Sequence, residues 1–182
     1  MSLQKPKMLL HICCAPCSTA VIERLKDKCE ITGYFYDPNI HPKEEYLRRL
    51  EETKRLYNEI GIPLIEAQYD AEIWFKLTGD FKHEPEGGKR CELCYDMRLE
   101  KAAGFAKGNG FDIFATVLSI SPHKKAEAIN NIGRRLAEKY DIKFYEADFK
   151  KKNGFKRSLE LSREYNLYRQ DYCGCVYSRG RF

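Results

Sequence analysis

The chain has 182 residues, which is enough for one sizeable domain that buries a core without disulfide staples. Its hydrophobic content of 43% and charged content of 32% are ordinary for a soluble globular protein. No apolar run approaches the ~20 residues that cross a bilayer, and His11 interrupts the short apolar stretch that could suggest a signal peptide. We therefore expect a cytoplasmic protein without a membrane partner, in which the eight cysteines serve chemistry more than structure.

The net charge of +5 is concentrated in the C-terminal part of the sequence. Residues 143–182 contain ten Lys/Arg and five Asp/Glu, whereas the rest of the chain contains 22 of each kind. A basic surface interleaved with Tyr and Phe suits phosphate backbones and stacked bases. A solvated charged face is an equally good interpretation of composition alone.

Apolar periodicity predicts that strands and helices alternate along the chain. In chain order, we expect strands at 7–13, 30–37, 63–70, 111–120 and 142–148. Helices are expected at 18–28, 41–61, 71–79, 91–110 and 121–140, with one more before the tail. Ser121 is the expected N-cap of the 121–140 helix, with Pro122 at its first position. This alternation predicts a single α/β domain (1–182) with a mostly parallel sheet and a basic, cysteine-containing segment at about 150–182.

Three histidines occur where predicted strands end or have just ended. Ligands of such sheets collect beyond the carboxyl ends of the strands, so the fold would gather the segments HICC, DPNIH and LSISPHK at one edge. Each of His11, His41 and His123 is by itself more often a structural side chain than a catalyst. Their shared position makes them candidate acids or metal ligands.

The first group of cysteines follows the first predicted strand. Cys14-Ala-Pro-Cys17 is a C-x-x-C motif at a helix start, where the helix N-terminus lowers the pKa of a thiol. This motif alone would indicate a thioredoxin-like oxidoreductase. The adjacent Cys13 and the length of the alternating pattern argue against that small fold.

The second group is Cys91-Glu-Leu-Cys94, in the first turn of a predicted helix, where the two sulfurs face the same way. Together with Cys13 and Cys14 it makes a set of four thiolates, which suits zinc or an iron–sulfur cluster. Adjacent cysteines project in divergent directions, so they suit a multi-atom cluster better than a single zinc ion. The spacing therefore favours a cluster, with zinc as the alternative.

The third group is Cys173-Gly-Cys175 near the C-terminus. Cys-x-Cys closes a small, strained disulfide ring of the labile, redox-active kind, and an additional pair of metal ligands is the alternative. Cys29 has no partner in the sequence and is expected to be a buried residue without chemistry.

Five blocks, taken together, resemble the QueH-type epoxyqueuosine reductases: LLHICCAPCS, YFYDPNIHPKEEYLRR, RCELCYDMRL, TVLSISPHK and YRQDYCGCVYS. They follow one another in that family's order from about residue 8 to 178. The resemblance implies a Rossmann-like (HUP-type) three-layer fold, as in the nucleotide-binding group that includes ATP pyrophosphatases. It also implies an iron–sulfur oxidoreductase that converts epoxyqueuosine to queuosine at the wobble position of tRNA, the last step of queuosine biosynthesis.

The resemblance also implies roles for the cysteines. The ligands of a 4Fe–4S cluster fall on Cys13, Cys14, Cys91 and Cys94. The redox-active pair falls on Cys173 and Cys175. The family is associated with an additional mononuclear iron, and Cys17 is a candidate ligand of such a second metal. Side chains do not supply single electrons, so the two-electron, two-proton reaction requires this redox cofactor and an unidentified electron donor.

The basic, aromatic C-terminal segment would bind the anticodon stem-loop that carries epoxyqueuosine. The expected phosphate contacts are Lys150, Lys151, Lys152, Lys156 and Arg157. Two alternative functions remain. One is a metal-independent thiol–disulfide oxidoreductase built on Cys14 and Cys17, and the other is a zinc-stabilised RNA-binding module.

Overall fold

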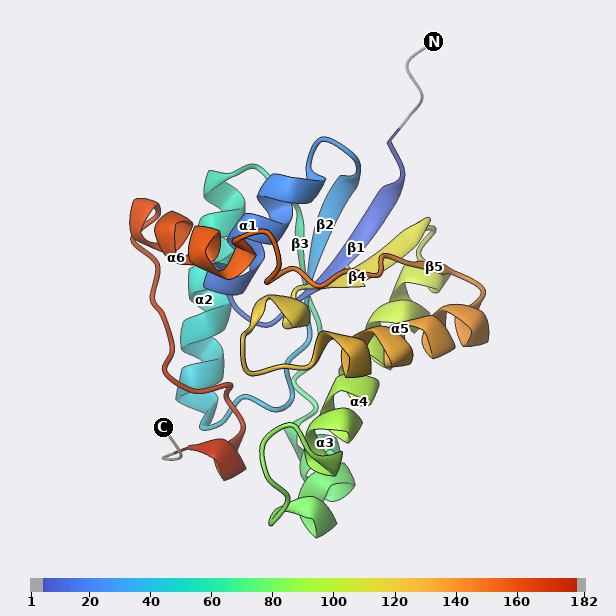
Figure 1. The fold of residues 1–182 in the computed structure, drawn as a ribbon, viewed down its shortest axis with the longest axis vertical. Coiled ribbons are helices and arrows are strands. Elements are labelled where there is room, and N and C mark those ends of the chain that lie inside the picture. The colour runs from blue at the N-terminus through green and yellow to red at the C-terminus, as the bar shows by residue number, and fades with distance from the viewer. Residues whose placement is uncertain (1–4, 180–182) are drawn as a thin grey trace.

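One parallel sheet organises the computed structural model, which describes residues 5–179 (Figure 1). The strands pair in the order β3-β2-β1-β4-β5, and all four pairings are parallel. Their bounds are β1 Lys7–Ile12, β2 Glu30–Phe35, β3 Leu64–Glu66, β4 Ile113–Thr116 and β5 Lys143–Phe144. The structure confirms the predicted α/β class, since helical crossovers connect each strand to the next one in the chain.

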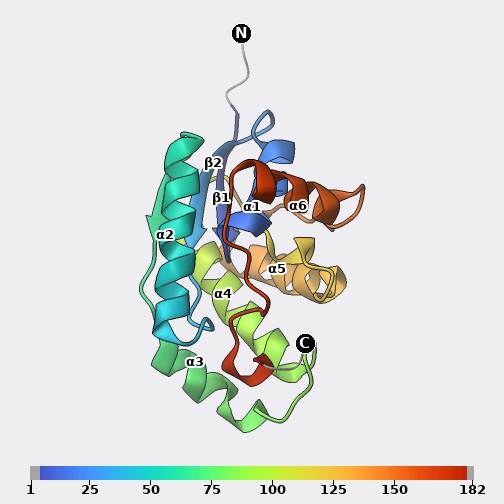
Figure 2. The same cartoon turned by 90° about the vertical axis from the view of Figure 1, so that its left-hand side faces the viewer.

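Helices cover both faces of this sheet (Figures 1 and 2). They are α1 Ala15–Leu25, α2 Lys43–Glu59, α3 Ala71–Thr78, α4 Lys89–Gly108, α5 Ala126–Tyr140 and α6 Gly154–Glu164. One core contains side chains of α1, α2 and α6, and the other contains side chains of α4 and α5. This is the three-layer arrangement that the resemblance implies.

The central strand β1 is buried on both faces, which explains its continuous apolar sequence. Met8, Leu10 and Ile12 belong to the core that contains α1, whereas Leu9 belongs to the core that contains α4. Alternation of side chains along a strand produces this division. Within the described residues, no helix is both long and apolar enough to cross a membrane.

Two predicted boundaries near residue 120 are wrong. The strand predicted to run to residue 120 ends at Thr116, whose Oγ1 accepts a hydrogen bond from the Leu118 N–H (3.2 Å) and helps to turn the chain into a short 3-10 helix. The next helix starts at Ala126, so Ser121 is not its cap. Ser121 Oγ instead accepts from the His123 N–H (3.3 Å), and this local hydrogen bond competes with helix formation. The segment 121–125 is therefore a loop at the carboxyl edge of the sheet.

Candidate active site

The first thiol group lies directly beyond the carboxyl end of β1. The sulfurs of Cys13, Cys14 and Cys17 all lie within 4.8 Å of one another. Cys14 is the N-cap residue of α1, and no side chain caps this helix. The positive end of the helix dipole therefore acts on the thiols, as the C-x-x-C motif predicts.

The three thiols have very different proton affinities. Burial raises the pKa of Cys14, but hydrogen bonds from Cys13 and Cys17 bring it well below its usual value. Gln170 Nε2 also donates to Cys14 Sγ (2.9 Å), and the Arg49 guanidinium adds its charge. The same thiol–thiol hydrogen bonds raise the pKa of Cys17 well above its usual value. The group thus holds a thiolate at Cys14 and a proton at Cys17.

A second thiol group lies beside the first and surrounds a cavity of about 20 Å³. It contains Cys91, Cys94, Cys173 and Cys175. The first two belong to the first two turns of α4, which begins at Lys89, and the other two belong to the C-terminal tail. Burial raises the pKa of Cys91 and of Cys94, so their surroundings favour the protonated thiols.

Arg49, a buried residue of α2, fixes the tail in this position. Its Nη1 donates to the Cys173 carbonyl (3.1 Å), its Nη2 to the Tyr172 carbonyl (3.0 Å) and its Nε to Glu45 (2.7 Å). The backbone also pairs, because the His41 N–H donates to the Gly174 carbonyl (2.8 Å). The segment that carries the Cys-Gly-Cys motif is therefore anchored to α2 and to the loop before it.

Gly174 is required where the tail turns. Its φ is +105°, a region that side chains disfavour, and a Cβ on it would lie 2.8 Å from Cγ1 of Ile40. The turn brings Cys173 and Cys175 together. Hydrogen bonding from Cys175 lowers the pKa of Cys173 well below its usual value, although burial opposes this, and Lys124 adds its charge. The pKa of Cys175 is raised by the same bond, so Cys173 is the thiolate of the pair.

The two thiol groups meet at a larger cavity of about 240 Å³, which has room for about eight water molecules. Cys13, Cys17 and Cys173 line it together. Its charged lining residues are mostly cations, namely Arg49, Arg98, Lys124 and Arg169, beside the two acidic residues Glu86 and Asp171. Apolar side chains of Leu118, Ile120 and Phe155 complete the walls. The cavity can thus hold a polar, ring-sized ligand against sulfur and positive charge.

Arg98 lies between the two thiol groups and lines both cavities. It forms a buried ion pair with Asp37, whose pKa burial raises to about 7 against the opposing charge of Arg98. Arg98 also acts electrostatically on Cys13 and on Cys94. Within residues 5–179, Asp37 Oδ2 and Arg98 Nε lack hydrogen-bond partners. Buried polar atoms without partners, next to several thiols, are what a bound metal-containing group with hydrogen-bonding atoms would satisfy.

The structure separates the three candidate histidines. His11 is buried in β1 between Thr116 Oγ1 (2.9 Å) and the Tyr36 carbonyl (3.2 Å), and burial lowers its pKa to about 3. His41 packs against the Phe75 ring at 4.4 Å, and burial lowers its pKa to about 4. Both rings are neutral at pH 7 and absent from the walls of the larger cavity. His123 lines that cavity at its exposed rim.

The expected phosphate-binding residues lie on α6 and the loop that precedes it. Arg157 contacts three carboxylates, those of Glu23, Glu160 and Glu164. Lys150 pairs with Asp148 at 2.9 Å. The remaining members of the set, Lys151, Lys152 and Lys156, are exposed. Phe155 and Ser158 of α6 line the larger cavity, so these exposed lysines belong to an element that forms part of its wall.

Sequence reasoning missed Arg49, Arg98, Lys124 and Gln170. The sequence could have identified Arg98, because it follows Cys94 by four residues and therefore lies on the same face of α4. Gln170 and Arg49 contact thiols or tail carbonyls through tertiary structure alone. No local pattern could have identified them.

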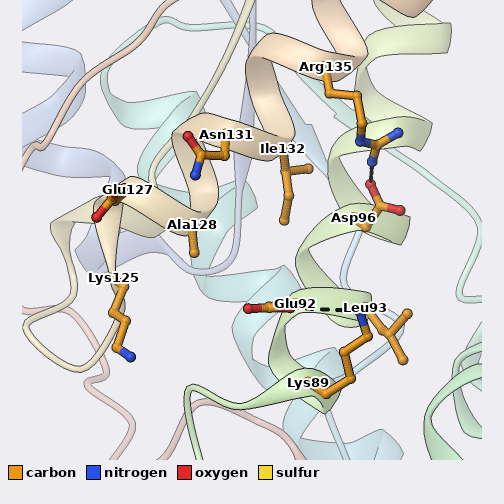
Figure 3. A pocket seen from close by; sticks show the side chains of 10 residues that line it. All are labelled: Lys89, Glu92, Leu93, Asp96, Lys125, Glu127, Ala128, Asn131, Ile132 and Arg135. Atoms are coloured by element: carbon orange, nitrogen blue, oxygen red, sulfur yellow. Dashed lines mark hydrogen bonds and ion pairs between the residues drawn. The ribbon is translucent and has the colours of Figure 1, made fainter.

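A groove of about 430 Å³ between α4 and α5 does not belong to the site (Figure 3). Four of its polar side chains pair with one another: Lys89 with Glu92, and Arg135 with Asp96. Leu93 and Ile132 form the apolar part of its lining. None of the eight cysteines lines it, so it offers no reactive group.

Comparisons with known proteins agree with the geometry. A family model described as "Epoxyqueuosine reductase QueH" matches residues 8–181. The relative of that name from Streptococcus pyogenes serotype M1 is 44% identical over 180 residues, covering 96% of this chain and 71% of its own. The relative from Haemophilus influenzae is 48% identical over 174 residues (94% and 71%), and the one from Thermotoga maritima 37% over 174 residues (94% and 89%).

A solved structure is similar in fold alone. A crystal structure described as a predicted subunit of a tRNA methyltransferase from Methanocaldococcus jannaschii has a TM-score of 0.59 and 14% identity, covering 86% of this chain and 75% of its own. The family match and these relatives, together with the converging thiols, confirm the resemblance in the five sequence blocks. The chain therefore belongs to the epoxyqueuosine reductase QueH family of oxidoreductases.

Proposed function

We propose that this protein removes the epoxide oxygen of epoxyqueuosine at the wobble position of tRNA and leaves queuosine. The observation that carries the proposal is the larger cavity, where thiols of both groups meet cationic side chains in a chain of the reductase family. The net reaction converts an epoxide, two electrons and two protons into an alkene and water. An unidentified donor provides the electrons.

Cys13, Cys14, Cys91 and Cys94 are the proposed ligands of a 4Fe–4S cluster. Arg98 supports this set, because one buried guanidinium acts on Cys13 of the first group and on Cys94 of the second. Such a cluster supplies single electrons when it is bound. Cys17, within 4.8 Å of Cys13 and Cys14, is the proposed ligand of an additional iron.

Cys173 and Cys175 are the proposed redox-active pair. Cys173 lines both cavities, and Ser178 Oγ lies 3.1 Å from its sulfur. A stabilised thiolate is the form that attacks a disulfide or is oxidised with Cys175. The pair can therefore release two electrons as it closes to a disulfide, and an external donor would restore the dithiol.

The proposed tRNA surface surrounds the mouth of the larger cavity. Exposed Lys151, Lys152 and Lys156 offer phosphate contacts, whereas the three carboxylates around Arg157 weaken its contribution. Arg169 lies over the Phe155 ring at 5.9 Å, where a splayed-out base could stack. The wobble base would thus enter between α6 and the tail.

The test combines metal analysis with the reaction. Protein purified without oxygen should contain about four irons and four sulfides per chain, with more iron if the second site is filled. Cys91→Ser should lose this iron, whereas Cys29→Ala, a buried cysteine outside both thiol groups, should keep it. Mass spectrometry of digested tRNA should show that the wild-type protein removes one oxygen atom from epoxyqueuosine.

The alternatives predict different outcomes in the same experiment. A metal-free protein whose activity survives Cys91→Ser would favour the thiol–disulfide oxidoreductase. A tightly held zinc without iron, and unfolding on chelation, would favour the zinc-stabilised RNA-binding module.

A further inference from the structure

Lys124 occupies a position that the metal and disulfide chemistry leave unexplained. It belongs to the loop 121–125 and lines both the larger cavity and the small cavity of the second thiol group. It is half-buried, and none of the ion pairs formed within residues 5–179 involves it. Cys173 lines both cavities with Lys124, and Cys13 and Cys17 line the larger one, so this side chain lies where the two thiol groups meet.

The reaction needs a proton for the departing oxygen, and few lining groups can provide one. Arg49, Arg98 and Arg169 do not give up protons in proteins. The Tyr172 hydroxyl already donates to the His41 carbonyl. The lining thiols have other proposed roles, Cys13 and Cys17 as metal ligands and Cys173 in the redox pair.

The rest of the lining offers serine hydroxyls, which are weak acids, and the side chains of Glu86 and Asp171, which accept hydrogen bonds as carboxylates. Lys124 and His123 are the nitrogen bases of this lining that can release a proton. His123 is exposed at the rim and lines only this cavity, whereas Lys124 reaches the thiols. A lysine side chain ordinarily carries three N–H donors as an ammonium group, so Lys124 can offer a proton when substrate arrives.

We propose that Lys124 is a catalytic residue that binds the epoxide oxygen and protonates it as the carbon–oxygen bonds break. The inference rests on the proposed function. Two electrons from the reductant enter the epoxide carbons, the two carbon–oxygen bonds break and a carbon–carbon double bond forms. The oxygen takes one proton from the Lys124 ammonium and a second from solvent, and it leaves as water. Solvent then reprotonates the amine.

The experiment compares Lys124→Ala with Lys125→Ala, a matched control because Lys125 is exposed and lines the α4/α5 groove instead (Figure 3). Single-turnover reduction by Lys124→Ala should be slower by about 10²–10⁴-fold, as for loss of a general acid. Added ethylamine should restore its rate at least about tenfold, because it replaces the missing ammonium group. Lys125→Ala should retain the wild-type rate and show no response to ethylamine.

A binding measurement separates this role from a structural one. Wild-type protein should bind tRNA with epoxyqueuosine about tenfold more tightly than tRNA with queuosine, since only the former offers the epoxide oxygen to a charged donor. Lys124→Ala should lose this preference and keep its iron content, its visible spectrum and its affinity for queuosine-containing tRNA.

The inference is overturned if Lys124→Ala keeps the wild-type rate or the preference for epoxyqueuosine. It is also overturned if His123→Gln, and not Lys124→Ala, shows the loss and the amine rescue. Failure of the proposed function itself would look different, because the wild-type protein would then leave epoxyqueuosine unchanged.

Discussion

Replacing Arg49 with Met is expected to loosen the tail that carries Cys173 without unfolding the domain. The guanidinium makes two charge-assisted hydrogen bonds to the tail, at 3.0 Å and 3.1 Å, to the carbonyls of Tyr172 and Cys173. Such bonds contribute about 1.5–3 kcal/mol each, so the closed tail should lose at least about 3 kcal/mol. The open form should then be populated about 100-fold more, at tenfold for each 1.4 kcal/mol.

Hydrogen exchange can measure this opening at two amides. The His41 N–H donates to the Gly174 carbonyl (2.8 Å), and the Ser178 N–H donates to the Cys175 carbonyl (3.0 Å). Both amides should exchange about 100-fold faster in Arg49→Met, because tail opening exposes them. The Val117 N–H, bonded to the His11 carbonyl inside the sheet, should exchange at the wild-type rate.

Lys54→Met is the matched control, since Lys54 lies on the same helix and its ion pairs within residues 5–179 are with exposed Glu51 and Glu66. This variant should leave the hydrogen-exchange rate of every tail amide unchanged. The reasoning fails if Arg49→Met accelerates the two tail amides less than about threefold, or if it accelerates the sheet amides equally.

Three further predictions test other parts of the molecule. Gly133→Ala should lower the free energy of unfolding by about 1–3 kcal/mol in a urea titration, because its Cβ would lie 2.2 Å from the Phe144 ring. Gly108→Ala should be neutral or stabilising by about 0.5–1 kcal/mol, because nothing lies within 4 Å of its Cβ, and equal losses in both variants would contradict the packing argument. Burial lowers the pKa of His41 from 6.5 to about 4, so the unfolded chain takes up this proton first. The contribution of neutral His41 to the free energy of unfolding should be complete above pH 6.5 and fall as the pH decreases towards 4. In His41→Gln the free energy of unfolding should therefore depend less steeply on pH in this range. Parallel curves for the two proteins would refute this.

The order of the strands could be predicted because their apolar runs are bounded by turns and polar residues, but the strands expected at 63–70 and 142–148 are only Leu64–Glu66 and Lys143–Phe144. The buried run at 8–12 and the helix at 43–59 have lengths and periods that local sequence determines. The loop 121–125 could not be predicted in the same way, since Ser-Pro is also a good helix start. Side chain–backbone hydrogen bonds at Thr116 and Ser121 favour the loop instead.

The thiol groups were predictable only in part. Cys13, Cys14 and Cys17 follow one strand end, so their proximity follows from the chain itself. The approach of the tail to Cys91 and Cys94 depends on Arg49, which lies 124 residues before Cys173. Contacts between such distant segments leave no periodic signal in the sequence. Only the resemblance to the family's ordered motifs linked the segment of Cys91 and Cys94 with that of Cys173 and Cys175.

The tail has a consequence for how the protein is made. Cys13 emerges from the ribosome first, whereas Cys173 and Gly174, which anchors to His41, are synthesised 160 residues later. At about 5–20 residues per second, the N-terminal thiols wait about 8–30 seconds for the segment that covers them. During that interval the cavity lacks the wall that the tail provides. The hydrogen bonds between Arg49 and the tail thus hold in place the part of the cavity that is synthesised last.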